Sequence, residues 1–165
     1  MQFSVGVEYA LHCLCFIGRD RPVGVKELAA YQGVSETYLS KMLTKLRKSG
    51  IVRSIPGVNG GYELTREPDR ITFWDVVQAI EGESPLFQCC EIRQHSAIVD
   101  RNNLPDAYCK KPCVIKTVML EAEDKMRDYL RSKNIGWLGE QLRKKLDPQQ
   151  IKDTDEWFKH RKTSL

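Results

Sequence analysis

The stretch RSIPGVNGGYELTREPDRITFWDVVQAIEG, from Arg53 to Gly82, decides how this chain folds. Gly57, Gly60 and Gly61 lie where two short strands must reverse direction, and glycine adopts a positive φ at such a turn without steric cost. Strand-forming residues flank the turn with period-two alternation; they are Ile51, Val52 and Ile55 before it, and Tyr62, Leu64 and Thr65 after it. This pattern predicts a β-hairpin.

Helical patterns lie on both sides of the hairpin. Upstream, we expect a helix at 4–19, capped by Ser4, and two more at 25–32 and 35–50. The core face of the first helix is expected to carry Phe3, Val7, Ala10, Leu14 and Ile17. Gly33 supplies a tight turn between the second and third helices, which is typical of a helix-turn-helix unit. A hairpin directly after such a unit is a wing, a ribbon that reaches a DNA groove.

Downstream, Thr72 is a candidate cap for a fourth helix that ends at Gly82. Residues 83–111 show no sustained periodicity, so we expect a long loop, and loops of that length are functional or disordered. Pro112 fits the first turn of a long helix at 112–133. Residues spaced 4, 3, 4 and 3 apart form a narrow seam on it, which favours a dimerisation helix over one that packs on its own domain; they are Ile115, Met119, Ala122, Met126 and Tyr129.

These elements predict a mainly α fold with a small β-wing, in four segments. Residues 1–82 form a winged helix-turn-helix DNA-binding domain, and 83–111 form a cysteine-bearing loop. Residues 112–146 hold the dimerisation helix and a short helix at 136–146. The charged tail at 147–165, in which Trp157 and Phe158 are the only aromatic residues, is expected to be mobile.

The composition is that of a soluble globular protein, with 41% hydrophobic and 29% charged residues over 165 residues. A net charge of +4 permits a polyanionic partner. No apolar run approaches the ~20 residues that span a bilayer, and no signal peptide is evident, so we expect a cytoplasmic protein without membrane contact. In that reducing compartment six cysteines are free thiols, metal ligands or redox groups rather than a disulfide framework.

The third helix has the two faces that a recognition helix needs. Leu39, Met42, Leu43 and Leu46 turn inward, while polar tips face outward toward bases and phosphates. The residues expected to contact DNA from this helix are Ser35, Glu36, Thr37, Tyr38, Ser40, Lys41 and Lys45; those expected from the wing are Arg53, Asn59, Gly60 and Tyr62. Lysines here neutralise phosphates and supply affinity without sequence information.

Several motifs over residues 1–146 resemble the Rrf2 family of bacterial repressors, which includes IscR, NsrR and CymR types. They are the runs at 8–11, 34–41, 46–52, 60–62 and 75–82, which occur in the family's order and spacing. The resemblance implies a homodimer that reads a pseudo-palindromic double-stranded DNA operator, with the recognition helix in the major groove and the wing beside it.

The cysteines at 89, 90, 109 and 113 are candidates for a redox sensor. Cys113 lies at the start of the long helix, where the helix dipole and nearby lysines favour a thiolate. Family members with iron–sulfur clusters often hold three cysteines close together, but Cys89 and Cys109 are far apart here. Other members bind a [2Fe-2S] cluster through two loop cysteines and a Glu and a His from the partner's first helix. Glu8 and His12 match those positions, and Cys89, followed by the run at 91–94, also resembles that subgroup.

Three alternatives stay open beside this cluster held by Glu8, His12, Cys89 and Cys109. Without metal, a thiol–disulfide switch could operate among the same loop cysteines, with Cys90 and Cys113 as redox thiols. The Cys/His set also suits zinc. The third alternative is a protein with a different kind of function, either a thiol-dependent enzyme or an adaptor that binds another protein. No Cys-x-x-Cys, nucleotide-binding or nucleophile-elbow motif is present to support the enzyme. We expect a redox-responsive DNA-binding repressor and no enzyme activity, with Cys13 and Cys15 as packing residues.

Overall fold

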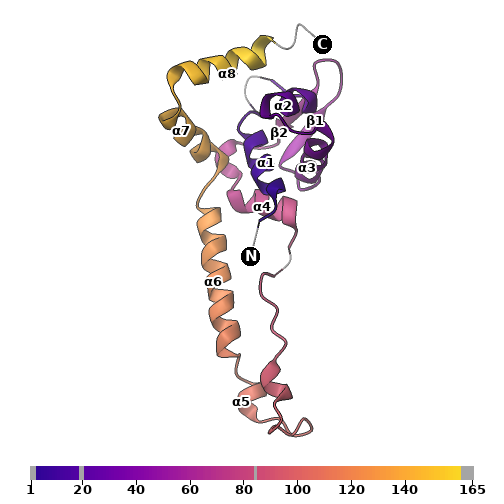
Figure 1. The fold of residues 1–165 in the computed structure, drawn as a ribbon, viewed down its shortest axis with the longest axis vertical. Helices are drawn as coiled ribbons and strands as arrows, with labels where there is room; N and C mark the ends of the chain where they lie inside the picture. The colour runs from indigo at the N-terminus through magenta and orange to yellow at the C-terminus, as the bar shows by residue number, and fades with distance from the viewer. Residues whose placement is uncertain (1–2, 19–20, 84, 161–165) are drawn as a thin grey trace. The chain divides into compact units, whose positions relative to one another are not determined.

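The computed structural model describes residues 3–18, 21–83 and 85–160, and it divides into two compact units (Figure 1). One unit combines the chain up to Gly82 with the segment that starts at Leu130. The other runs from Glu83 to Tyr129. Of the helices described, none is long and apolar enough to cross a bilayer.

The first unit contains a winged helix-turn-helix. Its helices are α1 (Val5–Leu14), α2 (Val25–Gln32), α3 (Glu36–Lys48) and α4 (Phe73–Glu81), and its strands are β1 (Val52–Ile55) and β2 (Gly61–Leu64). After a short 3-10 turn at Pro68–Arg70, the chain enters α4. The predicted second, third and fourth helices and the hairpin are confirmed. Thr72 caps α4 as expected, since its hydroxyl accepts the Asp75 N–H at 3.0 Å.

The wing is a two-stranded antiparallel sheet in which Val52 pairs with Leu64 and Ile55 pairs with Gly61. Gly57 and Gly61 have φ values of 105° and 150°, so the expectation of positive φ is confirmed at both. Gly60 is required for another reason: a Cβ there would lie 2.1 Å from the Ile55 carbonyl oxygen. The hairpin therefore needs glycine at this position because the backbone approaches itself too closely for any side chain.

The core lies between α1, the helix-turn-helix and the base of the wing. It includes Val7, Ala10, Cys13, Leu14, Ile17, Leu28, Leu39, Leu43, Leu46, Ile51, Val76 and Ile80. Cys13 is fully buried, and this burial raises the pKa of its thiol to about 12, which confirms it as a packing residue. Cys15 is half-buried and donates to the Leu11 carbonyl oxygen at 3.3 Å.

Three expectations for the first helix were wrong in detail. The helix ends at Leu14 and continues only as turns, while Arg19 lies outside the described residues. Phe3 is 36% exposed and is not part of the core. Ser4 occupies the cap position, but its main-chain N–H and its hydroxyl both donate to a Glu81 carboxylate oxygen, at 2.9 and 2.7 Å. This bond ties the start of α1 to the end of α4.

The part of the expected mobile tail that the structure describes is instead helical, while residues 161–165 lie outside the described residues. After α7 (Ile135–Lys145) comes α8 (Pro148–His160), whose Phe158 is buried in the core. The Phe158 ring stacks on Phe16 at 5.1 Å and lies 5.0 Å from Tyr31, and Trp157 meets Tyr31 at 4.9 Å. Two polar contacts accompany these aromatic ones: the Tyr31 and Thr154 hydroxyls lie 2.9 Å apart, and Arg21 donates to the Phe158 carbonyl oxygen. Together these contacts dock α8 on the winged-helix unit.

The second unit holds the cysteine loop and most of the long helix α6 (Val114–Arg131). The loop contains a short 3-10 turn at Ile92–His95 and a single helical turn, α5 (Asp106–Cys109). The long helix is confirmed, but it begins two residues after Pro112, so Cys113 immediately precedes it. Most of its apolar side chains are exposed, including Ile115 at 67% and Tyr129 at 65%.

Candidate functional site

The two faces of α3 are divided as a recognition helix requires. Leu39, Met42, Leu43 and Leu46 are buried against the core. The opposite face exposes most of the predicted DNA-contacting residues of this helix; they are Ser35, Glu36, Thr37, Lys41 and Lys45, while Tyr38 and Ser40 are half-buried. The structure therefore gathers the predicted contacts on one solvent-facing surface.

Two of these residues also have partners within the protein. The Tyr38 ring packs edge-on against Tyr9 of α1, with ring centroids 5.4 Å apart. The Lys45 ammonium donates to the Ile80 carbonyl oxygen at 2.6 Å, at the carboxyl end of α4 where the helix dipole attracts a cation. Lys45 therefore fixes α3 against α4, whereas Lys41 is exposed on the outer face.

The wing presents the other predicted contacts. Asn59 is exposed near its tip, and Arg53 pairs with Glu63 across the two strands at 2.5 Å. Tyr62 is half-buried, and its main chain exchanges two hydrogen bonds with Val23, at 2.8 and 3.0 Å. These bonds anchor the ribbon to the segment before α2, so the wing has a fixed position relative to the helix-turn-helix.

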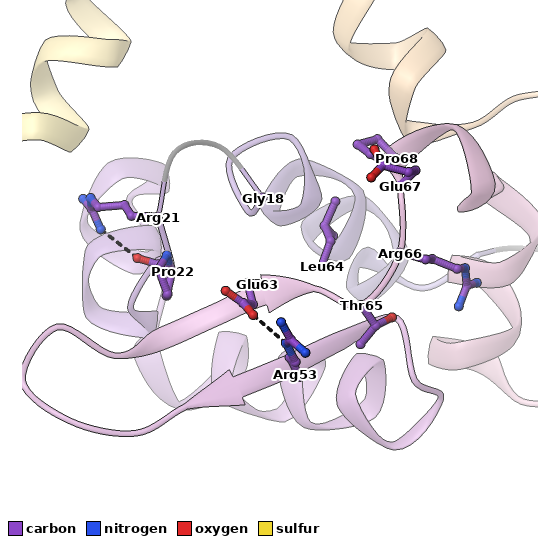
Figure 2. A pocket seen from close by; sticks show the side chains of 10 residues that line it. All are labelled: Gly18, Arg21, Pro22, Arg53, Glu63, Leu64, Thr65, Arg66, Glu67 and Pro68. Atoms are coloured by element: carbon purple, nitrogen blue, oxygen red, sulfur yellow. Dashed lines mark hydrogen bonds and ion pairs between the residues drawn. The ribbon is translucent and has the colours of Figure 1, made fainter.

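A hollow of about 400 Å³ lies at the base of the wing (Figure 2). It is lined by Gly18, Arg21, Pro22, Arg53, Glu63, Leu64, Thr65, Arg66, Glu67 and Pro68. Its guanidinium groups are engaged: Arg21 bonds the Pro22 carbonyl oxygen and Glu27, Arg53 bonds Glu63, and Arg66 bonds Asp75. The lining holds no cysteine or histidine, so it offers no thiol or imidazole for the predicted sensor.

The cysteine loop is organised by an ion pair. Glu91, in a left-handed conformation with φ 47°, pairs with Arg93 at 2.8 Å. The hydrogen bond from Arg93 holds the pKa of the Glu91 carboxyl below its usual range. The Cys89 sulfur lies 3.6 Å from the other oxygen of this carboxylate. Cys89 is thus half-buried beside a charged pair, whereas Cys90 and Cys109 are exposed.

Cys113 lies at the amino end of α6, half-buried. Main-chain hydrogen bonding from Lys116 lowers the pKa of its thiol, and a bond from Ile115 and the charge of Arg93 act in the same direction. The predicted thiolate-favouring environment is confirmed, but main-chain N–H groups and Arg93 create it rather than lysine side chains.

Comparison with known proteins identifies the fold and the regulatory role. The Rrf2 family model, described as an iron-dependent transcriptional regulator, matches residues 3–141. The chain belongs to the Rrf2 family. A protein of Aquifex aeolicus that is named as an HTH-type transcriptional regulator is 30% identical over 137 residues, which cover 82% of this chain and 89% of that protein.

Two solved Rrf2 structures resemble the chain along most of its length. CymR, titled the global cysteine regulator of B. subtilis, is 25% identical with a TM-score of 0.64, covering 85% of this chain and 97% of that one. T. potens IscR is 25% identical with a TM-score of 0.64, covering 89% and 93%. Such relatives are regulators rather than enzymes, so this Rrf2 protein is a DNA-binding transcriptional regulator and the enzyme alternative is set aside.

The predicted cluster ligands lie in both units of this Rrf2 chain. Glu8 and His12 are exposed on α1, whereas Cys89 and Cys109 belong to the cysteine loop. Within the described residues no group of three or more His, Cys, Asp or Glu side chains could hold a metal ion. The predicted cluster would take two ligands from each of two chains. A single chain therefore does not test this ligand set, and it stays a prediction.

Sequence reasoning missed the residues that organise the loop. Arg93 and Glu91 belong to the run at 91–94 that marked the resemblance, but their ion pair was not foreseen. The charged residues two and four positions after Cys89 were the available signal. Arg93 is therefore added to the residues that hold the cysteine loop together.

Proposed function

We propose that this Rrf2 protein is a redox-responsive repressor that binds its operator as a homodimer and senses through a [2Fe-2S] cluster. In this proposal residues 1–82 read DNA, 83–111 form the sensor loop, and α6 joins two chains. The observation that carries it is the joint presence of an exposed Glu8–His12 pair, one helical turn apart on α1, and a folded cysteine loop in a family described as iron-dependent.

DNA reading is supported by the exposed polar face of α3 and the anchored wing. The test uses a duplex selected from a randomised pool by the wild-type protein. Lys41→Ala should weaken binding and lower the salt slope by about one, because one phosphate contact is lost. Lys152→Ala, which removes an exposed lysine of α8, is the matched control. Equal affinities and slopes for the Lys41 and Lys152 variants would exclude α3 as the DNA-reading helix.

Dimerisation is supported by the apolar side chains that α6 exposes, among them Val114 at 77%, Ile115 at 67% and Val118 at 57%. A helix with so many exposed apolar residues marks an interaction surface. Met119→Glu with Met126→Glu should yield a monomer by light scattering, because two charges would be buried at the joint. Lys125→Glu on the same helix is the control. A dimeric double variant would place the interface elsewhere.

The donor chemistry fits a [2Fe-2S] cluster. Cys89 and Cys109 would supply thiolates, and Glu8 and His12 of the other chain a carboxylate and an imidazole. The bound cluster would supply one-electron redox chemistry, at a potential that imidazole ligands raise. The residues themselves join α1 of one chain to the sensor loop of the other, so the oxidation state would bias the relative placement of two DNA readers.

Protein purified without oxygen from iron-replete cells tests this ligand set. It should be coloured, with equal amounts of iron and sulfide. Cys89→Ser, Cys109→Ser and His12→Ala should lose the colour, whereas Cys13→Ala should keep it, and Cys90→Ala checks the choice between neighbours. Zinc in place of iron, or colourless protein after reconstitution, would defeat the cluster.

A cluster-free thiol switch is the second candidate, and the environment of Cys113 favours it. Its sulfur receives main-chain N–H groups at a helix start, which is the setting of reactive thiols. For this candidate, thiol oxidation alone should release DNA from metal-free protein, and Cys113→Ser should abolish that release.

A further inference from the structure

Arg93 bonds to both cysteine-bearing segments of the loop. Its guanidinium pairs with Glu91 at 2.8 Å and donates to the main-chain carbonyl oxygens of Lys111 at 3.1 Å and Ala107 at 3.4 Å. Glu91 follows Cys89 by two residues, while Ala107 and Lys111 flank Cys109 on either side. One side chain thus joins the segment at 89–95 to the segment at 107–113.

Two further contacts hold the segment at 89–95 against the segment at 107–113. The guanidinium carbon lies 5.5 Å from the centre of the Tyr108 ring, a cation–π arrangement. The Gln94 amide donates to the Tyr108 carbonyl oxygen at 3.0 Å. The Arg93 side chain is only 26% exposed, although arginine is most often found on protein surfaces. A guanidinium with this many directed bonds is held in one orientation.

The pKa of the Arg93 guanidinium is raised mainly by the hydrogen bond to Glu91, with smaller contributions from Cys113 and Cys89. In turn, the charge of Arg93 helps to lower the pKa of the Cys113 thiol. The Arg93 Nε is buried and finds no acceptor among the described residues, which is rare enough in folded proteins to need an explanation. Glu91 opposes the charge at this site, and Lys116, which interacts with Glu91, adds to it.

We propose that Arg93 is the positioning residue of the sensor loop: it fixes the two cysteine segments together and holds its positive charge against the Lys111 carbonyl oxygen, two residues before Cys113. Its role in sensing rests on the proposed function. Its effect on the thiols does not, because the contacts lie within the loop itself. A fixed cation beside sulfur stabilises the more negative state, whether that state is a thiolate or a reduced cluster bound through thiolates.

The test compares an anionic and a neutral disulfide probe on the metal-free, reduced full-length protein. Each cysteine attacks the probe disulfide, forms a mixed disulfide and releases one aryl thiolate. The probes are dithiobis(nitrobenzoate) and dithiodipyridine, and mass spectrometry assigns the rate at each cysteine. The ratio of the two rates reports local charge, because the general accessibility of a thiol affects both probes.

In Arg93→Gln the anionic-to-neutral rate ratio should fall at least threefold at Cys113 in low salt, and the difference should shrink at high salt. Arg93→Lys, which keeps the charge but not the planar fork, should retain most of the ratio. Arg101→Gln removes an exposed arginine of the same loop and should change nothing. An unchanged ratio in Arg93→Gln, or an equal fall in Arg101→Gln, overturns the proposal.

In protein that carries the cluster, Arg93→Gln should also shift the one-electron equilibrium at least tenfold toward the oxidised form, which corresponds to 59 mV. An unchanged potential beside an intact cluster overturns the role of Arg93 in sensing. Colourless wild-type protein would instead defeat the proposed function, while the probe ratios would still decide the charge effect of Arg93.

Discussion

Replacing Phe158 by alanine should detach α8 from the winged-helix unit. The Phe158 side chain is 8% exposed and packs between the rings of Phe16 and Tyr31. Truncating a buried phenylalanine to alanine costs ~3–5 kcal/mol. The loss cannot exceed the free energy with which α8 docks, because the helix can come off locally while the rest of the unit stays folded. We therefore expect the lower end, about 3 kcal/mol.

Urea unfolding followed by circular dichroism measures this cost, and the melting temperature should fall by about 6–12 °C for a chain of this size. Deleting residues 147–165 gives the largest loss of stability that Phe158→Ala can cause, since the deletion removes the docking free energy of α8 entirely. Lys152→Ala is the control: its ammonium lies 3.9 Å from Glu156 on the exposed side of α8, and such pairs contribute less than ~1 kcal/mol. If Phe158→Ala and the deletion unfold at the wild-type urea concentration, the docking described here does not stabilise the protein.

Three further changes follow from single contacts. Gly60→Ala should weaken DNA binding at least tenfold, measured by fluorescence anisotropy, because the added Cβ would collide with the Ile55 carbonyl oxygen. Gly24→Ala is the control and should bind like the wild type, because the space around Gly24 is open. Equal affinities for the two variants would show that DNA binding does not need the wing. The pKa of the Cys113 thiol is lowered, so its thiolate persists as the pH falls. Iodoacetamide should therefore label Cys113 near neutral pH, where the buried Cys13 stays unmodified. If the labelling rate of Cys113 has its pH midpoint at or above that of an ordinary thiol, this prediction is wrong. Thr72→Ala should cost ~1 kcal/mol in urea unfolding through loss of the α4 cap, and no change would mean that Asp75 alone suffices.

The winged unit could be predicted from sequence because its signals are local. Gly33 and the glycines of the hairpin mark turns, Thr72 begins α4, and the apolar spacing of α3 separates its two faces. Each of these features depends on residues close together in the chain. The same holds for the exposed polar face of α3, since its orientation follows from the apolar residues that anchor the helix.

The parts that sequence reasoning missed depend on distant partners. The helix α8 carries few large apolar residues, so its pattern is typical of a solvated segment. Contacts with residues more than a hundred positions away, among them Phe16 and Tyr31, make it part of the core. Arg93 is bound to main-chain carbonyl oxygens, which any residue type provides. Neither kind of contact leaves a periodic pattern in the sequence.

The end of α4 joins α1, which carries Glu8 and His12, to α3, the proposed DNA-reading helix. Ser4, at the start of α1, bonds to Glu81, and Lys45 of α3 bonds to the adjacent Ile80 carbonyl oxygen. Gly6 lies between them, and a Cβ there would come within 2.7 Å of the Met42 sulfur of α3. Closely packed interiors transmit displacement rather than absorb it. The start of α1 thus packs against both α3 and α4, so we expect a displacement of α1 by a ligand on Glu8 to be transmitted to α3, the proposed recognition helix.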